Sequence, residues 1–430
     1  MTSDLSVHIS GANTVWVLLS AALVMFMTVP ALGMFYGGLV KKKNVLNIMM
    51  QSFTSLGVVS VIWVTFGYSL AFSPSELVPG ILGDFRWAML SGIGPSDVSP
   101  YFVSDATGRV PHIAFIAFQC MFAVITPAVI SGAMAERMKF PAYVLFITLW
   151  TVVVYVPLTH MMWSANGLFA RQGLADFAGG TVVEINSGFS ALACALALGK
   201  RRNLRGAPPH DLTYTLAGAA MLWFGWFGFN AGSSLAADGL AAHAFLITIM
   251  AGEVAALAWD ALDWAIQKKP TILGFATGGV AGLVVITPAA GYVNLAGAMA
   301  LGAAAGLVCY AMVVFVKNAL HYDDSLDAFG VHGIAGLLGI LGTGLLADPA
   351  ITRGFAMAGG SGIAGLAFGG AKLFGVQALA ALVTIFVAFC GSSAILWVVD
   401  RLIGLRVTEK EEAIGLDATQ HNERAYTVIE

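Results

Sequence analysis

The chain has 430 residues, of which 58% are hydrophobic and only 10% are charged. An ordinary soluble domain carries roughly 25% charged residues, so this composition excludes a water-soluble globule. Fifty glycines and a mean hydropathy of +0.83 are typical of a polytopic helical membrane protein. The net charge of -3 gives no general attraction for nucleic acid. The four cysteines lie apart in apolar runs and predict neither a disulfide framework nor a metal site.

The apolar segments predict an all-α polytopic membrane protein. A bilayer core about 30 Å thick is crossed by roughly 20 apolar residues of helix, and the charged residues mark where the segments end. The sequence therefore predicts eleven spans, at 13–40, 45–72, 112–135, 140–162, 181–199, 212–235, 241–264, 271–288, 293–317, 329–347 and 372–402.

The positive charges predict the orientation. Most lysines and arginines follow the odd-numbered spans, which places those ends in the cytoplasm, the N-terminus outside and the tail 403–430 inside. Residues 1–12 lack the basic segment of a signal peptide, so we interpret the first apolar run as a retained helix. The stretch 270–316 holds no charged residue and breaks at Thr287-Pro288, which indicates a hairpin of two spans.

The eleven predicted spans divide into two sets of five and one further span. Because five is an odd number of crossings, the second set runs through the membrane in the opposite direction to the first, which predicts an inverted repeat. The membrane domain is 1–402, with repeat one at about 13–199, repeat two at about 212–347 and the eleventh helix at 372–402. In such folds, corresponding polar, glycine-rich helix starts point to a site near the middle of the membrane. Here these starts are DFAGGTVVE at 176–184 and DAFGVHG at 327–333.

Two ionisable side chains follow these helix starts, Glu184 and His332. A buried ionisable group in a span costs several kcal/mol, about 3 kcal/mol on insertion scales, so each is a functional hypothesis. The alternatives are a packing histidine bonded to a carbonyl and a structural glutamate. Glu253 in the seventh span carries no motif, and we interpret it as structural or interfacial.

The remaining candidates are an acid and four aromatic residues. Asp176 precedes a helix start and is suited to cap it, and it could also act electrostatically. The aromatic side chains have ring faces that could hold a cation, although packing or membrane-interface roles explain each one singly. They are Trp163, Phe122, Trp226 and Phe229.

At this point the chain resembles the ammonium transporter (Amt/Mep/Rh) family, and is most similar to its bacterial Amt members. The resemblance runs from Val15 to Tyr426 and implies eleven spans, a homotrimer with one pore per subunit, and ammonium as substrate. The motifs that carry it are ISGAMAER at 130–137, DFAGGTVV at 176–183, GWFGFNAGS at 225–233, FGVHG at 329–333 and GLRV at 404–407.

The resemblance implies a role for each candidate by position. Trp163, Ser233 and Phe122 match an outer cation-binding site, and Asp176 matches the acid that supports the entrance. Phe122 and Phe229 match a stacked gate, and Trp226 matches an aromatic residue that lines the pore beyond it. His332 matches the second of two pore histidines, whereas Glu184 stands where the family usually has the first, as in some fungal Mep proteins.

These matches predict that ammonium is recruited outside, loses a proton and crosses as ammonia past Glu184 and His332. We expect the pair to return the proton, which would make transport electrogenic. By the predicted topology, Glu184 lies near the outer start of its span and His332 near the inner start of its span, at opposite faces of the membrane. The two side chains therefore meet only if both helices begin inside the protein. The alternatives are an ammonium sensor or transceptor that signals through its tail, and an Rh-like gas channel.

The predicted partners follow from the same resemblance. They are ammonium or ammonia, with methylammonium as an analogue, further subunits of a homotrimer, and the bilayer of the inner (plasma) membrane. A PII-type signal protein at the cytoplasmic face is a further candidate. We expect no cofactor and no enzymatic activity, because no HExxH, GxSxG or clustered cysteines occur. The mixed-charge tail 403–430 is predicted to dock and to regulate.

Overall fold

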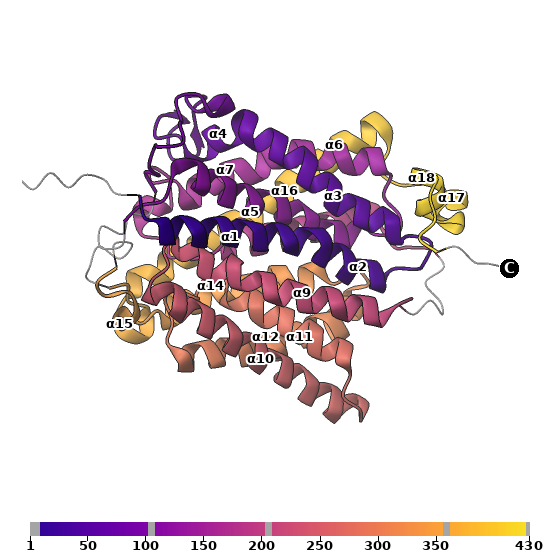
Figure 1. The fold of residues 1–430 in the computed structure, drawn as a ribbon. Coiled ribbons are helices and arrows are strands. Elements are labelled where there is room, and N and C mark those ends of the chain that lie inside the picture. Colours follow the sequence, from indigo (N-terminus) through magenta and orange to yellow (C-terminus); the bar gives the residue numbers. More distant parts are fainter. Residues whose placement is uncertain (1–8, 102–107, 203–208, 356–361, 427–430) are drawn as a thin grey trace, which may run out of the picture.

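The computed structural model describes residues 9–101, 108–202, 209–355 and 362–426, and it is a bundle of helices that run roughly along one axis (Figure 1). The segments around residues 73–101 and 164–179 lie at one end, called the outer end below. The tail lies at the opposite end, called the inner end, which is on the right in Figure 1.

The first five segments run from the N-terminus to residue 198. Several are single helices interrupted by a wider π-helical turn, so one span carries two labels. In chain order they are α1 (Gly11–Phe26) with α2 (Gly33–Leu39), α3 (Val45–Ile62) with α4 (Tyr68–Phe72), α5 (His112–Met134), α6 (Phe140–Trp150) with α7 (Val156–Trp163), and η6 (Gly180–Ile185) with α8 (Asn186–Leu198). A short antiparallel hairpin, β1 (Glu76–Val78) and β2 (Leu82–Gly83), lies in the outer loop after α4.

The second half continues with the predicted hairpin and ends in the tail. Its helices are α9 (Leu212–Asn230), η7 (Ala231–Ser234), α10 (Gly239–Gln267), α11 (Ile272–Ile286), α12 (Leu295–Ala311) with α13 (Lys317–Leu320), η9 (Phe329–Gly333) with α14 (Ile334–Leu346), α15 (Pro349–Thr352), α16 (Ala371–Ile403), α17 (Glu409–Ile414) and α18 (Leu416–His421). The turn at 287–294 separates α11 from α12, as the break at Thr287-Pro288 predicts.

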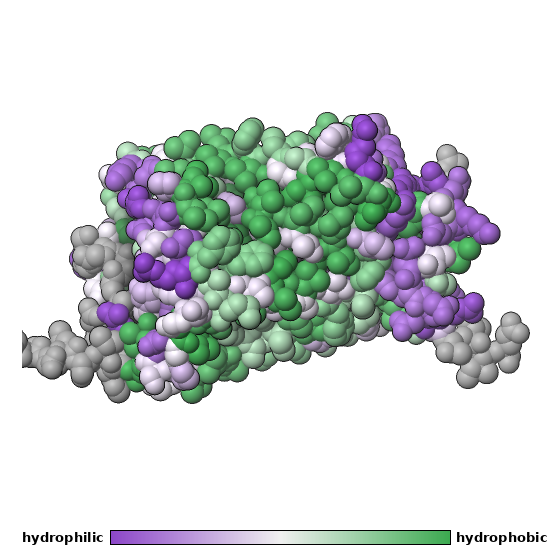
Figure 2. All heavy atoms as spheres, turned by 90° about the horizontal axis from the view of Figure 1, so that it is seen from above, coloured by the Kyte–Doolittle hydropathy of each residue, from purple (hydrophilic) through white to green (hydrophobic). Residues whose placement is uncertain are grey.

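The protein is a multi-pass membrane protein. Nine helical segments within the described residues are long and apolar enough to cross a bilayer. The predicted spans 212–235 and 271–288 coincide with α9 and α11, which fall outside that set; α11 has 15 residues, about 22 Å of helix. The count of eleven, the inverted repeat and the orientation stay predictions. Hydrophobic residues cover the middle of the molecule and hydrophilic ones gather at both ends (Figure 2).

The tail binds the inner ends of several helices. Lys139 N donates to Leu405 O (2.9 Å), and Val407 N donates to Arg137 O (3.0 Å). The Asp417 carboxylate accepts from Asn47 N at 2.8 Å, in the first turn of α3. Asn44 precedes this helix without capping it, so the tail supplies the acceptor that the helix start lacks.

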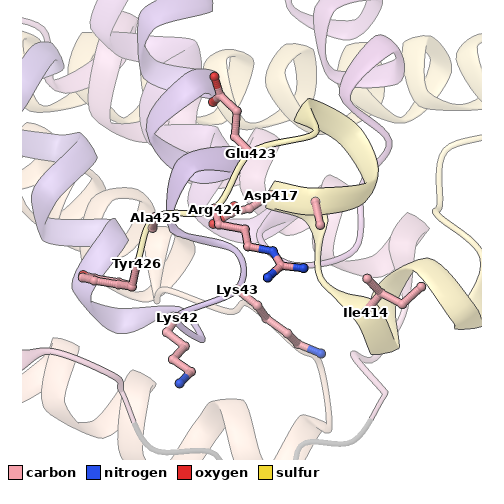
Figure 3. Close-up of a pocket in the computed structure, with 9 residues that line it drawn as sticks. Lys42, Lys43, Ile414, Asp417, Glu423, Arg424, Ala425 and Tyr426 are labelled. Atoms are coloured by element: carbon pink, nitrogen blue, oxygen red, sulfur yellow. The ribbon is translucent and has the colours of Figure 1, made fainter. Parts of the chain in front are cut away.

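The tail also closes a groove of about 240 Å³ against the loop between α2 and α3 (Figure 3). Lys43 joins this loop to the tail, because its ammonium group donates to the carbonyl oxygens of Glu412 and Ala413 in α17. Lys42 and Tyr426 line the same groove. The tail is therefore an integral part of the inner end.

Two helices of the centre cross with almost no space between their backbones. A Cβ atom added to Gly188 of α8 would lie 2.1 Å from Gly333 N, and one added to Gly336 would lie 2.6 Å from Glu184 Cβ. Only glycine fits such an approach. The crossing brings the first turns of the predicted spans 181–199 and 329–347 together.

Replacing Gly188 with alanine should therefore destabilise the bundle by about 1–3 kcal/mol, because the new methyl group overlaps Gly333 backbone atoms. Thermal unfolding in detergent would measure the loss. Gly57→Ala is the matched control, since nothing lies within 4 Å of a Cβ at that position of α3. Equal melting temperatures for the two variants would contradict the prediction.

Candidate functional site

Asp176 determines where the fifth predicted span begins. Its carboxylate accepts hydrogen bonds from Gly179 N (3.1 Å), Gly180 N (2.6 Å) and Thr181 N (2.9 Å). These are free amides at the start of η6, so Asp176 caps the helix within the protein. Gly179 has a φ of 115°, and a Cβ on Gly180 would lie 2.5 Å from Pro288. The helix start is thus inside the bundle, against the turn after α11.

An outer vestibule of about 410 Å³ opens in front of this cap. Trp163, at the end of α7, and Asp176 both line it, together with Tyr101 and Tyr292. The Trp163 indole donates to Asp176 O at 3.3 Å, which fixes the ring beside the cap. The Trp163 and Phe122 rings meet edge to face, with centroids 5.8 Å apart. Aromatic faces and a buried acid therefore surround one outer cavity.

Two phenylalanine rings lie next to the vestibule, because Phe122 contacts Trp163, and Phe229 lines a cavity deeper in the bundle. The centroids of Phe122 and Phe229 are 4.4 Å apart, with ring planes tilted by 38°. Ser233, on η7, donates its hydroxyl hydrogen to Phe229 O at 2.7 Å, one turn beyond the ring. The hydroxyl oxygen keeps its acceptor capacity. The residues predicted for the gate thus lie together, with Ser233 connected to them through Phe229.

Trp226 lies beyond the two rings, and its indole is held in place. The Trp226 and Phe229 centroids are 5.5 Å apart, and Trp226 Nε1 donates to Thr287 Oγ1 at 3.0 Å. Thr287 in turn bonds to Asn230 Oδ1 at 3.2 Å. The sequence analysis assigned Thr287 only to the turn, and nothing in its local pattern indicates this contact with α9.

Glu184 and His332 meet in the centre of the bundle. His332 Nδ1 lies 2.7 Å from Glu184 Oε2. His332 is 7% exposed and Glu184 is 1% exposed. Both line a cavity of about 20 Å³ whose remaining walls are mostly apolar and include Phe229 and Trp226. That volume accommodates about one water-sized molecule.

An inner cavity of about 70 Å³ continues from this pair. His332 lines both cavities, and Asp327 and Tyr36 line the inner one. Asp327 opens the second predicted helix start and pairs with Lys317. Asp324, which the sequence analysis did not single out, accepts the hydrogen bond from Phe329 N (2.7 Å). Burial raises the pKa of Asp324 to about 6.

Taken together, these contacts define a membrane channel or carrier for a small solute: an outer vestibule, a pair of stacked aromatic rings and two cavities that share His332. The Ammonium Transporter Family model matches residues 15–426. The chain is 44% identical to an ammonium transporter of Bacillus subtilis, covering 96% of this chain and 98% of that one. It is 42% identical to ammonium transporter Amt1 of Archaeoglobus fulgidus, covering 97% and 100%.

Solved structures agree with this match. The Mep2 structure of Saccharomyces cerevisiae superposes with a TM-score of 0.85 at 32% identity, over 95% of this chain and 90% of that chain. A structure described as a sensor Amt protein gives 0.82 at 26% identity, over 95% and 98%. The chain therefore belongs to the ammonium transporter family, whose named relatives are transporters and not enzymes.

Asp176→Asn should destabilise the outer part of the bundle, because one amide oxygen cannot replace a carboxylate that accepts from three consecutive backbone amides. We expect a loss of about 1–2 kcal/mol, the range for a helix cap. The measurement is thermal unfolding in detergent, with Asp260→Asn, a partly exposed carboxylate on α10, as control. An unchanged melting temperature for Asp176→Asn would refute the capping role.

Proposed function

We propose that the protein transports ammonium, recruiting NH4+ at the outer site and conducting ammonia and a proton separately past the Glu/His pair. The single observation that carries this proposal is the contact of Glu184 with His332 in a cavity that holds about one small molecule. Membership of the ammonium transporter family supports ammonium as the substrate.

Recruitment uses aromatic faces and oxygen acceptors. The Trp163 and Phe122 rings attract the ammonium cation. The Ser233 hydroxyl oxygen accepts a hydrogen bond from one of the N–H groups of ammonium. Asp176 offsets the loss of water around the cation through its charge, while its oxygens stay engaged with the helix start. Sodium and potassium ions have no N–H to donate, so the outer site favours ammonium over them.

Deprotonation follows from the pore beyond the gate. A full charge between apolar walls is costly, and a cavity of about 20 Å³ leaves no room for a hydration shell. Ammonium therefore transfers its proton to water in the outer vestibule before the Phe122 and Phe229 gate. Neutral ammonia crosses, and the proton reaches the Glu/His pair separately. Ammonia accepts a proton again on the inner side, where the cavity lined by Asp327 and Tyr36 widens.

The Glu/His pair carries the proton. A distance of 2.7 Å between an imidazole nitrogen and a carboxylate oxygen is a hydrogen bond, so one proton lies between them. Because the two side chains share this proton, the pair can accept a proton on one side and release one on the other. One NH4+ ion gives one NH3 and one H+, which pass separately and recombine to NH4+ at the inner side. Each cycle therefore moves one positive charge.

Glu184→Gln should abolish ammonium-evoked current while leaving the fold intact, because glutamine keeps the shape but cannot exchange a proton. Current in proteoliposomes after ammonium pulses is the measurement, with potassium pulses to test selectivity. The control is Asp260→Asn on α10, whose side chain is partly exposed and lines none of the cavities described above. An undiminished current with unchanged selectivity in Glu184→Gln would remove the relay.

A second candidate function is ammonium sensing. The extensive docking of the tail gives the inner end a segment through which occupancy could be read out, and the similarity to a sensor Amt protein favours the same class. An Rh-like gas channel is less well supported, because a neutral gas needs no cation site of the kind formed by Trp163 and Phe122.

We propose a homotrimer in the plasma membrane, with the inner end in the cytoplasm and a PII-type protein as a candidate partner there. Glu253 supports assembly, because it is exposed near the middle of the 29-residue α10. A carboxylate facing lipid at that depth is costly, whereas a neighbouring subunit would cover it. The proposed architecture has eleven spans and an inverted repeat, with α9 and α11 as two of them.

Deleting residues 404–430 should depress transport without unfolding the spans. The deletion removes the Asp417 carboxylate from the start of α3 and the Leu405 and Val407 backbone contacts from the loop after α5. Methylammonium uptake and size-exclusion chromatography would measure the two effects. The matched control deletes only 427–430, which lies outside the described residues. Full activity of the longer deletion would make the tail dispensable.

A further inference from the structure

A buried histidine lies one turn before Trp163 and takes no part in the pathway described above. His160, in the last turn of α7, is completely buried. Its Nδ1 lies 2.9 Å from Ala71 O, at the end of α4, and its Nε2 lies 3.2 Å from Glu76 Oε1, in β1. His160 thus connects the helix that carries Trp163 to the outer hairpin.

Glu76 extends this connection to the loop that follows Trp163. Its Oε1 accepts from Gly80 N at 2.7 Å, and its Oε2 lies 3.2 Å from Arg171 Nη2. The hairpin and the loop are also joined through their backbones, since Leu168 N donates to Gly80 O at 2.9 Å. The loop itself folds back onto α7, where Phe169 N donates to Met161 O at 2.9 Å.

The contact between His160 and Glu76 requires a proton. A carbonyl oxygen only accepts, so the bond to Ala71 O leaves the hydrogen of a neutral imidazole on Nδ1. Nε2 then presents a lone pair to a carboxylate oxygen, which also only accepts. The 3.2 Å contact is a hydrogen bond only when one additional proton lies on the pair.

Neighbouring groups place that proton on the imidazole. Burial disfavours the charge of Glu76, but the Gly80 amide, His160 and Arg171 outweigh it and hold the pKa of the Glu76 carboxyl below its usual value. Asp84, the other carboxylate near the hairpin, accepts from Ser73 Oγ and Arg86 N and is engaged there. The bonded form is therefore an imidazolium paired with a carboxylate.

We propose that Glu76 is a positioning residue for the outer ammonium site, and that with His160 it forms a proton-dependent clamp that holds Trp163 in place. The inference rests on the proposed function of that site. Because the contact needs the additional proton, an alkaline medium at the outer end removes it and releases the hairpin. Recruitment then weakens, whereas passage through the pore, which Glu76 does not touch, keeps its maximum rate.

The test is methylammonium uptake between about pH 5 and 9, over which imidazole groups commonly titrate. Methylammonium stays protonated across this range, so its own titration does not intervene. In the unmodified protein the KM should rise several-fold toward the alkaline end. Glu76→Ala should show a raised KM at every pH, with a maximum rate close to that of the unmodified protein.

Glu76→Gln distinguishes a proton-dependent clamp from a merely structural contact. Both contacts are made by Glu76 Oε1, so a glutamine that donates its amide nitrogen to neutral His160 gives up the bond from Gly80 N. Because that contact needs no additional proton, the KM of this variant should not change with pH. Asp97→Asn is the control, because that carboxylate lies in the outer loop and accepts from Gly94 N. It should follow the pH profile of the unmodified protein.

Two results would overturn the clamp: pH profiles of KM that coincide for the unmodified protein and Glu76→Gln, or a KM in Glu76→Ala equal to that of the unmodified protein. If Glu76→Ala does not fold, the Glu76→Gln comparison decides alone. A protein that takes up no methylammonium at any pH would instead refute the proposed function.

Discussion

The hydrogen bond between Glu184 and His332 is the constraint on which the centre of the bundle depends. Neither side chain can stand alone between apolar walls, because an isolated charge there costs far more than a paired one. Bringing the two together requires their helices to approach until backbone touches backbone. Glycines at 188, 333 and 336 make this approach possible, and a methyl group at 188 or 336 would prevent it.

That approach also requires both helices to begin inside the protein. A helix that starts away from water leaves free amides that must find acceptors. Asp176 and Asp324 provide them at the two starts, each from an irregular segment that would be unstable in lipid but is stable where it lines a cavity. The vestibule and the inner cavity are thus the spaces in front of two capped helix ends.

The sequence predicts the helical class and most of the span boundaries, because long apolar runs admit few other structures. It also singles out Glu184, His332 and Asp176, since acids and histidines are rare in such runs. It places Glu184 and His332 near opposite faces of the membrane, however, because counting spans cannot detect a helix that begins partway through the membrane. It missed Asp324, which lies three residues before the DAFGVHG stretch and still reaches the amide of Phe329.

Contacts between distant segments could not be predicted at all. Thr287 resembles an ordinary turn residue, and only the packing of α11 against α9 brings its hydroxyl to the Trp226 indole. Glu76 lies in a short polar loop, 84 residues before His160, and an acid in such a loop predicts no particular contact. Local pattern has no information on such pairs, because each partner satisfies the rules of its own segment.

The cap that Asp417 provides to α3 has a consequence for biosynthesis. The second apolar segment, which contains α3, leaves the ribosome early. The Asp417 carboxylate that accepts from the first turn of this helix is made only after all the membrane-spanning segments. Until then the inner start of α3 must rely on water or on lipid headgroups for its free amides. The inner face is therefore complete only once residue 417 has been made, so a nascent chain that stalls before it exposes free amides at the start of α3.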